Sequence, residues 1–354
     1  MSSHVIMMPD ELVALAAEIL SGAGSAAEDA EIVASNLVWA DLRGRHPLGV
    51  ARLGVLAEML GRGFITSPAS MIWSGQAPAI AHLDAANGFG QVAGERAMRR
   101  AIEIAKVMGI GMVTVNHSHH FGAAGYYGAM AAEAGCMGVT TTNAPPRVAP
   151  HGGTRPVFGA NPIAFGCPGA PGAAPVLVDL ATSALAPSTV RAAKDAGEPL
   201  PEGSALDSRG NPTTDPAAAE GGSLVSAAGA KGSGLAFIAE ILSAILPGAG
   251  LSREIGRNAG NAHQRENCGH CFIAIDIGQT QPLRRYQERM DDLIGLVKDS
   301  SEIHPSPVRY PGELRGALER QYAREGIPVD EKTSRLLERL ARSVRIDVPW
   351  KQHS

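Results

Sequence analysis

The densest group of reactive side chains is the run from Asn116 to Gly122, which reads Asn-His-Ser-His-His-Phe-Gly. Imidazoles titrate near neutral pH, so His117, His119 and His120 are candidates for acids, bases or metal ligands. Adjacent histidines point apart and no carboxylate lies in the run, which disfavours a metal. We interpret the run as an acid–base site at the end of a strand, with an ordinary polar surface loop as the alternative.

Other positions suit an anionic ligand. Arg52 stands in an otherwise apolar helical stretch, where a guanidinium either clamps a carboxylate or lies exposed to solvent. Asp179, Thr182 and Ser183 follow an apolar stretch, so they either hold a ribose or phosphate or cap the next turn.

The glycine-rich segment 229–234, with Lys231, comes just before a predicted helix. Backbone N–H groups and a lysine suit a phosphate there, although the glycines can also serve packing alone. The chain contains neither a P-loop spacing nor a GxGxxG after a strand, so an ordinary dinucleotide-binding fold is disfavoured.

Cys268 and Cys271 flank Gly-His in a run that resembles one half of a zinc site. The other two cysteines, Cys136 and Cys167, are isolated in the sequence, and no second CxxC or HxxxH would complete a set of four ligands. We therefore expect no metal, and we expect this pair to flank the entry of a strand.

Hydrophobic periodicity predicts the elements that position these residues. Apolar spacings of three and four predict helices in the first 65 residues, including one over 48–60 that carries Arg52. Strands then alternate with helices, which is typical of an α/β layer. The predicted strands are 79–84, 111–116, 137–142, 162–165, 176–180 and 272–277.

The predicted helices of this middle part are 91–108, 122–134 and 232–245, whereas 195–222 is loop by composition and long enough to indicate a function. The C-terminal third returns to helix, over 313–325 and 330–343.

Helix-rich ends around an α/β middle indicate two domains, in line with a length of 354 residues. We predict an α/β cofactor-binding domain over 76–304. The helical domain comprises 1–75 and is joined by 305–354, so that the two chain ends build it together.

Composition excludes several classes of function. The chain has 31 Lys and Arg against 35 Asp and Glu, which argues against nucleic acid as the main partner. The longest apolar stretch, Leu235 to Gly250, contains Glu240 and Pro247 and is too short to span a bilayer. Four cysteines form no disulfide framework and no signal peptide is visible, so we expect a cytoplasmic protein.

Several motifs occur together and in order: ADLRG at 40–44, GVARL at 49–53, HFG at 120–122, GANP at 159–162, DLATS at 179–183 and YPGE at 310–313. With them, the chain resembles the malate/L-lactate dehydrogenase family of the sulfolactate-dehydrogenase type over nearly its whole length. The relatives include ureidoglycolate dehydrogenase, diketogulonate reductase and the Δ1-piperideine/pyrroline-2-carboxylate reductases.

The resemblance implies a non-Rossmann α/β fold, a homodimer, and NAD or NADP as the coenzyme. The substrate would be a small molecule with a carboxylate beside a ketone, alcohol or imine carbon. Arg52 would bind that carboxylate, with His120 and Asn161 facing the substrate. The implied coenzyme contacts are Asp179, Ala181, Thr182, Ser183, Lys231, Gly232, Gly312 and Glu313.

The chain departs from the family pattern at one functional turn. The family usually reads Asp-Ser-His-Gly-Val where this chain has His-Pro-Leu-Gly-Val from His46 to Val50. Pro47 therefore replaces the family's serine, and Leu48 replaces its acid–base histidine. Relatives also often carry Arg-Gly at the place of Pro187-Ser188.

Because Leu48 donates no proton, we expect His120 to do the remaining acid–base work, with His46 as the second catalytic candidate. A protonated cyclic imine already carries its proton and needs less acid catalysis than a ketone. The departure thus favours a cyclic imino acid over a 2-oxo acid. The alternative is a family member that binds NAD(P) or a carboxylate without efficient turnover.

Overall fold

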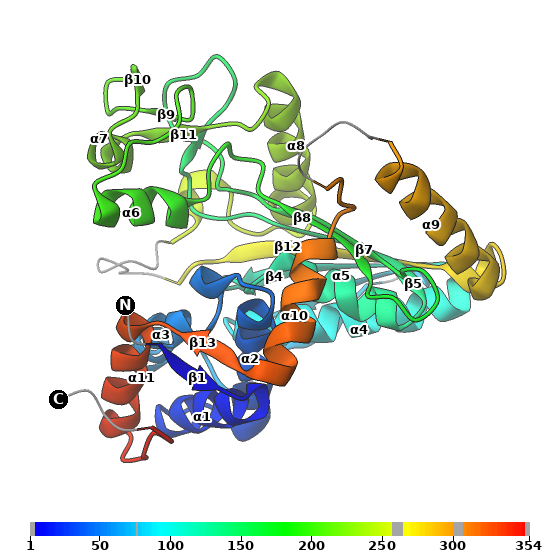
Figure 1. The fold of residues 1–354 in the computed structure, drawn as a ribbon, viewed down its shortest axis with the longest axis horizontal. Coiled ribbons are helices and arrows are strands. Elements are labelled where there is room, and N and C mark those ends of the chain that lie inside the picture. The colour runs from blue at the N-terminus through cyan, green and yellow to red at the C-terminus, as the bar shows by residue number, and fades with distance from the viewer. Residues whose placement is uncertain (1–3, 76, 257–264, 301–306, 351–354) are drawn as a thin grey trace.

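A seven-stranded mixed sheet forms the centre of the molecule (Figure 1). The computed structural model describes residues 4–75, 77–256, 265–300 and 307–350. The strands, in spatial order, are β2 Ile72–Ser74, β3 Ile80–Asp84, β4 Ile110–Ser118, β12 Cys268–Asp276, β5 Cys136–Thr142, β7 Ile163–Cys167 and β8 Val176–Leu180. In this sheet β3 and β4 run parallel, and all other neighbours are antiparallel. This order differs from a doubly wound parallel sheet, so the prediction of a non-Rossmann α/β fold is confirmed.

Two helices, α4 Gly90–Met108 and α5 Ala124–Glu133, cover one face of this sheet. Small residues allow the close approach. A Cβ on Gly111 would lie 2.1 Å from the carbonyl oxygen of Ala101. On α4, Ala93, Ala97 and Ala101 recur every four residues and are fully buried, so they form one apolar stripe against the strands. The close packing fixes the ends of β4 and β8, where the predicted site residues begin.

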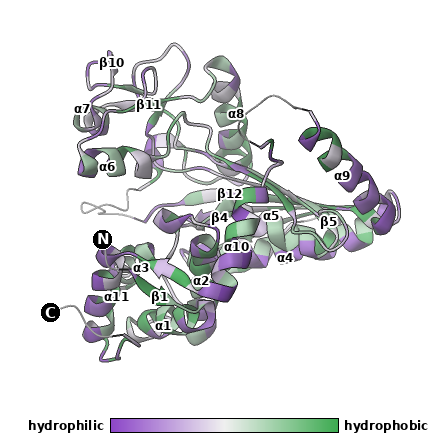
Figure 2. Ribbon diagram, viewed as in Figure 1, coloured by the Kyte–Doolittle hydropathy of each residue, from purple (hydrophilic) through white to green (hydrophobic). Residues whose placement is uncertain are grey.

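The two chain ends meet in a helical region. β1 Val5–Met7 pairs antiparallel with β13 Ile327–Val329, next to α1 Pro9–Gly22, α2 Ala27–Leu42, α3 Leu53–Gly61, α10 Glu313–Glu325 and α11 Glu331–Ser343. In Figure 2, α10 and α11 are largely hydrophilic, whereas the elements of the central sheet are more hydrophobic. A helical part built from both ends is therefore confirmed, while the boundaries at 75 and 305 stay predictions.

The helix predicted over 48–60 was wrong at its start. Two short 3₁₀ turns, η1 His46–Leu48 and η2 Val50–Arg52, come before α3. The buried carboxylate of Asp41 accepts a hydrogen bond from the N–H of Val50 at 2.8 Å, and a Cβ on Gly49 would collide with that carboxylate. This contact from α2 replaces the first helical turn, which local periodicity does not reveal.

The prediction of a plain loop over 195–222 was also wrong. The segment contains β9 Ala205–Leu206, β10 Pro212–Thr213 and α7 Pro216–Gly221, and it is followed by β11 Ser223–Val225. These strands join β6 Val148–Ala149 in a small four-stranded sheet, which α6 Pro187–Ala196 accompanies. Leu200, Leu224 and Phe158 share a small core there, so distant segments stabilise a lobe that polar composition concealed.

The remaining helices are α8 Ala230–Glu240, which continues into a π-helical turn at Ile241–Ile245, α9 Leu283–Lys298, and the short turns Ser252–Glu254 and Ile277–Gln279. Within the described ranges, no helix has the length and hydropathy needed to cross a membrane.

Candidate active site

The three histidines at the end of β4 point to three different places. His117 is exposed and its Nδ1 lies 3.0 Å from Oδ2 of Asp84. His119 is buried and its Nε2 hydrogen-bonds the carbonyl oxygen of Phe64 at 3.0 Å. The Nδ1 of His119 lies 3.4 Å from Oε2 of Glu266. His120 is partly buried, and the charge of Arg52 acts on its imidazole. A three-histidine site is therefore not formed.

His120 is held as a neutral imidazole. The N–H of Gly122 donates to its Nδ1 at 3.1 Å, so the ring proton lies on Nε2. Burial, the positive charge of Arg52 and the neighbouring His270 lower the pKa of His120 well below its ordinary value. The main-chain N–H of His120 donates to Oε2 of the buried Glu266 at 2.7 Å, which fixes the backbone of the residue. The side chain thus offers an N–H donor at pH 7.

Arg52 supplies a positive charge without an ion-pair partner among the described residues. It ends the turn η2, and its Nε is buried with no hydrogen-bond partner in the described parts of the chain. Burial lowers the pKa of the guanidinium, and the carboxylate of Glu266 raises it. Oε1 of Glu266 also lacks a hydrogen-bond partner there. We call Arg52, His120 and Glu266 the substrate cluster; its unmatched donor and acceptor are suited to a polar ligand.

Arg191 was missed in the sequence. Its charge lowers the pKa of Arg52, so the two guanidiniums share one electrostatic environment. Four residues further along α6, on the same helical face, Asp195 forms an ion pair with Lys332 of α11 at 3.2 Å. α11 in turn packs on η2, the turn that ends at Arg52. The one sequence signal for Arg191 is its position four residues after Pro187, about one helical turn into α6.

His46 lies in a separate pair with Asp41. Its Nδ1 is 2.9 Å from Oδ1 of Asp41, and its side chain is 40% exposed. The hydrogen bond to Asp41 raises the pKa of His46, opposite to the shift at His120. Its ring lies beside that of Tyr322, with centroids 6.5 Å apart. The described contacts do not connect His46 to the substrate cluster, and its catalytic role stays a prediction.

The predicted coenzyme residues at the end of β8 fall into two groups: one borders a cavity, and the other holds the neighbouring backbone. The carboxylate of Asp179 accepts hydrogen bonds from the N–H of Gly125 at 3.0 Å and pairs with Nη1 of Arg45 at 2.9 Å. Thr182 is buried, and its hydroxyl donates to the carbonyl oxygen of Ala160 at 3.0 Å. The hydroxyl of Ser183 donates to the carbonyl oxygen of Leu185. The two hydroxyls therefore hold the backbone, whereas Asp179 borders a cavity. Ala181, two residues after Asp179, is partly buried.

That cavity, of about 380 Å³, lies between α2, α5, β8 and the start of α10. It brings together Asp179 and Gly312, which are far apart in sequence. Gly312 has φ +90°, and a Cβ there would lie 2.9 Å from the amide nitrogen of Leu177. We call it the arginine cavity, because its border includes Arg43, Arg45, Arg309 and Arg315. Glu313 follows Gly312 but forms an ion pair with Lys298.

The other predicted ligand residues lie outside the substrate cluster and the arginine cavity. Lys231 is exposed at the start of α8, and Gly232 is required by packing, since a Cβ there would lie 1.9 Å from the carbonyl oxygen of Ala227. Asn161 is buried, and its Nδ2 donates to Oε2 of Glu240 at 2.6 Å. No described contact joins Lys231 or Asn161 to the substrate cluster, so their ligand roles stay predictions.

The cysteine pair lies inside a strand and does not flank its entry. Cys268 and Cys271 are buried in β12 with free thiols. His270 between them is hydrogen-bonded to Thr142 and Ser118 and stacks on Phe121, with ring centroids 4.6 Å apart. Burial lowers the pKa of His270 to about 3. Among the described residues, no group of three His, Cys, Asp or Glu side chains is placed to hold a metal ion.

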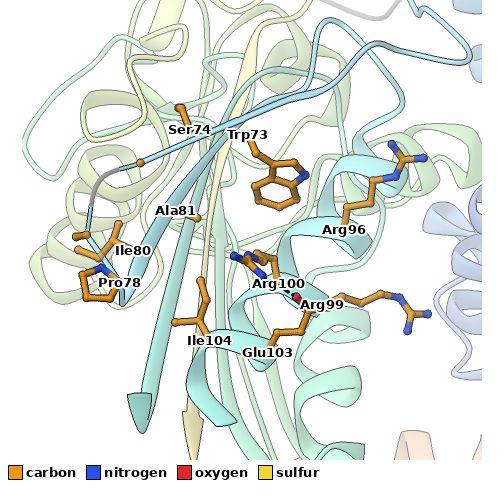
Figure 3. A pocket seen from close by; sticks show the side chains of 12 residues that line it. Trp73, Ser74, Pro78, Ile80, Ala81, Arg96, Arg99, Arg100, Glu103 and Ile104 are labelled. Atoms are coloured by element: carbon orange, nitrogen blue, oxygen red, sulfur yellow. Dashed lines mark hydrogen bonds and ion pairs between the residues drawn. The ribbon is translucent and has the colours of Figure 1, made fainter. Parts of the chain in front are cut away.

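A larger cavity, of about 710 Å³, lies elsewhere, between β2, β3 and α4. Figure 3 shows Trp73 and three arginines of α4 around it. Arg99 and Arg100 are mostly exposed and paired with Glu95 and Glu103. None of the predicted site residues borders this cavity. We propose the substrate cluster as the place of the chemistry, because Nε of Arg52 and Oε1 of Glu266 are buried there without hydrogen-bond partners among the described residues.

Comparison with known proteins shows the family of the chain. The chain matches the family model described as malate/L-lactate dehydrogenase over residues 7–338. It is 37% identical to a malate dehydrogenase of Pyrococcus abyssi, over 97% of this chain and 96% of that one. It is 33% identical to a Δ1-pyrroline-2-carboxylate/Δ1-piperideine-2-carboxylate reductase of Pseudomonas putida, over 94% and 96%.

Among solved structures, the sulfolactate dehydrogenase of Methanocaldococcus jannaschii superposes with a TM-score of 0.90 at 32% identity, over 97% of this chain and 98% of that one. Further relatives have NAD(+) or NADP(+) in their names.

Proposed function

The chain belongs to the malate/L-lactate dehydrogenase family and is an NAD(P)-dependent oxidoreductase, and we propose that it transfers a hydride to or from the carbon next to a carboxylate. The substrate we favour is a cyclic imino acid of the Δ1-pyrroline- or Δ1-piperideine-2-carboxylate type, with a 2-oxo acid as the second class.

One observation carries the proposal: Arg52 is a partly buried cation whose Nε is buried without a hydrogen-bond partner, and it forms no ion pair among the described residues. An uncompensated buried charge is unfavourable, so its retention beside His120 indicates a bound anion. A substrate carboxylate satisfies the guanidinium with two parallel N–H···O bonds. Bound in this way, the carbon next to the carboxylate comes within reach of His120.

His120 then orients the reacting group. With its proton on Nε2, the neutral imidazole donates a hydrogen bond to a carbonyl oxygen or an unprotonated imine nitrogen. The carboxylate also neutralises Arg52, which removes one cause of the low pKa of His120. Substrate binding therefore makes protonation of His120 easier at the moment when a proton is needed.

The residues of the arginine cavity fit a coenzyme that supplies the hydride when bound. Nη2 of Arg43 is buried there without a hydrogen-bond partner in the described parts of the chain, and Gly312 keeps the backbone close to β8. Arg45 and Gly312 would hold the adenosine end, and Asp179 would position Arg45 there. We propose that Ala181, Lys231, Gly232 and Glu313 contribute further along the coenzyme.

The substrate preference rests on Leu48 and Glu266. Leu48 leaves no proton donor on the turn η1 at its position, which weakens ketone reduction more than reduction of a protonated imine. Oε1 of Glu266, which has no hydrogen-bond partner among the described residues, suits a positively charged iminium N–H. Arg191 supports the second class, because an additional cation beside Arg52 favours a 2-oxo acid with two anionic groups.

The test is a substrate panel with NADH and NADPH: Δ1-pyrroline-2-carboxylate, Δ1-piperideine-2-carboxylate, pyruvate and oxaloacetate. We expect the highest kcat/KM with a cyclic imine. A higher value with oxaloacetate would assign the second class. Coenzyme binding, seen as enhanced NADH fluorescence, without turnover of any of these substrates would instead support the non-catalytic alternative.

We further propose that the protein is a cytoplasmic homodimer. The end of α8 and the following turn expose apolar side chains that suit a second copy: Leu235, Phe237, Ile238, Ile245 and Leu246. The four cysteines are free, as in a reducing compartment. Light scattering on a size-exclusion column tests the dimer, and a monomeric mass at micromolar concentration would contradict it.

A further inference from the structure

The arginine cavity carries far more positive charge than a ribose or an adenine requires. Four guanidiniums border it, from Arg43, Arg45, Arg309 and Arg315, and the one carboxylate in the border is that of Asp179. Burial and the charge of Arg45 lower the pKa of Arg315, so the guanidiniums act on one another. Such an excess of cations is stabilised by a polyanionic group.

Asp179 is not free to bind ribose hydroxyls. In Rossmann folds, the carboxylate that selects NAD accepts hydrogen bonds from the 2′-hydroxyl of the adenosine ribose, and a carboxylate in any fold needs a free oxygen to do the same. Here Arg45 binds the carboxylate through Nη1 at 2.9 Å and the main-chain carbonyl of Asp179 through Nη2 at 2.7 Å. The N–H of Gly125 occupies the same carboxylate oxygen. The two contacts neutralise the group that would otherwise repel a phosphate.

Two independent features then point to an anion. Arg43 lines the cavity, is 3% exposed and lies over the ring of Trp39 at 4.8 Å; its Nη2 is buried without a hydrogen-bond partner among the described residues, while its Nη1 binds Glu319. The 13-residue helix α10 begins at the cavity after Gly312, with Leu314 and Arg315 in the cavity border, so its positive dipole end lies at the same space. Arg309, exposed at the rim, forms no ion pair within the described ranges.

We propose that the arginine cavity binds the 2′-phosphate of the adenosine ribose, so that the coenzyme of this protein is NADP(H). The inference rests on the proposed function, since it assigns the coenzyme of that same oxidoreductase. In this assignment Arg309, Arg315 and the free Nη2 of Arg43 contact the phosphate, and Arg45 keeps Asp179 neutralised. The diphosphate, which NAD and NADP share, is the other phosphate that could lie here.

Isothermal titration with 2′,5′-ADP and 5′-AMP separates the two sources, because these ligands differ in the 2′-phosphate. We expect 2′,5′-ADP to bind at least about tenfold more tightly at low salt, the size of one charge-assisted contact. Arg309→Ala and Arg315→Gln should each reduce that ratio severalfold and leave 5′-AMP affinity nearly unchanged. Arg100→Ala, from the cavity of Figure 3, is the matched control and should leave both affinities unchanged.

Equal affinities for the two ligands would overturn the proposal and assign the cavity to the diphosphate. A preference that survives both arginine variants would place the 2′-phosphate elsewhere, which also overturns it. Either result leaves the oxidoreductase intact, as NADH-dependent turnover in the substrate panel would show. Failure of the proposed function has a different signature, namely no turnover of any panel substrate with either coenzyme.

Discussion

The substrate cluster and the arginine cavity each combine arginine with a carboxylate, but only in the arginine cavity do the two form an ion pair. In the cavity, Arg45 and Asp179 are joined at 2.9 Å, and Arg43 binds Glu319. In the cluster, Arg52 and Glu266 affect each other electrostatically without an ion pair. We therefore propose the cluster, and not the cavity with more charges, as the reacting site, because unmatched polar groups and perturbed pKa values mark functional sites better than the number of charges.

The largest expected effect comes from removing the unmatched charge. Arg52→Ala should lower kcat/KM by roughly 30- to 150-fold, equivalent to about 2–3 kcal/mol, because a bidentate contact to the substrate is lost. Since Arg52 has no ion-pair partner among the described residues, Arg52→Met should keep or raise the melting temperature.

Steady-state kinetics and differential scanning calorimetry check both statements. Arg52→Lys is the matched control, which keeps the charge but loses the forked geometry. Unchanged kinetics in Arg52→Ala would show that the two regions have been assigned the wrong way round.

The next effect concerns the neutral histidines behind the cluster. The pKa of His270 is about 3 in the folded chain against an ordinary value near 6.5, so the unfolded chain binds more protons between these values. Stability is therefore complete above pH 6.5 and falls with pH at about 1.4 kcal/mol per unit. Urea unfolding should show a loss of about 2 kcal/mol from pH 6.5 to pH 5.

His46 provides the opposite case near the turn η1. Because Asp41 raises the pKa of His46, its contribution is present below pH 6.5 and is lost as pH rises through the folded value. His46→Gln should therefore steepen the acid loss of stability, and His270→Gln should flatten it. A flat profile in the unmodified protein would mean that the buried histidines are not neutral.

A smaller effect is expected from restoring a donor on that turn. Leu48→His should raise reduction of 2-oxo acids by about tenfold, below the 10²–10⁴ of a fully positioned acid, and barely change reduction of cyclic imines. Competition kinetics with pyruvate and Δ1-pyrroline-2-carboxylate measure the ratio directly. Equal gains with both substrates would remove the argument for an imino acid.

The smallest effect tests Arg191. Its side chain acts on Arg52 through space, so Arg191→Ala should raise KM for oxaloacetate by roughly threefold and leave KM for pyruvate nearly constant. Arg147→Ala, which also lies in the small lobe, controls for a general loss of positive charge. An identical change for both substrates would place Arg191 outside the substrate site.

The sequence by itself determined the family and the α/β class, because its motifs occur in the order typical of that family. Local periodicity was sufficient for α4, β4 and α11, because their apolar faces repeat along one element. The residue order made Arg52 and His120 candidates, as a lone arginine in an apolar stretch and a histidine at a strand end, and the family resemblance supplied their predicted roles.

Only the tertiary structure decided which of these residues meet. The direction of His117 and His119, the neutral state of His120 and the pairing of Asp179 with Arg45 depend on partners 33 to 146 residues away or on burial. The lobe over 195–222 likewise gains its strands from β6, far earlier in the chain. Burial and charge pairing arise from contacts between distant segments, and a single sequence carries no record of which segments come into contact.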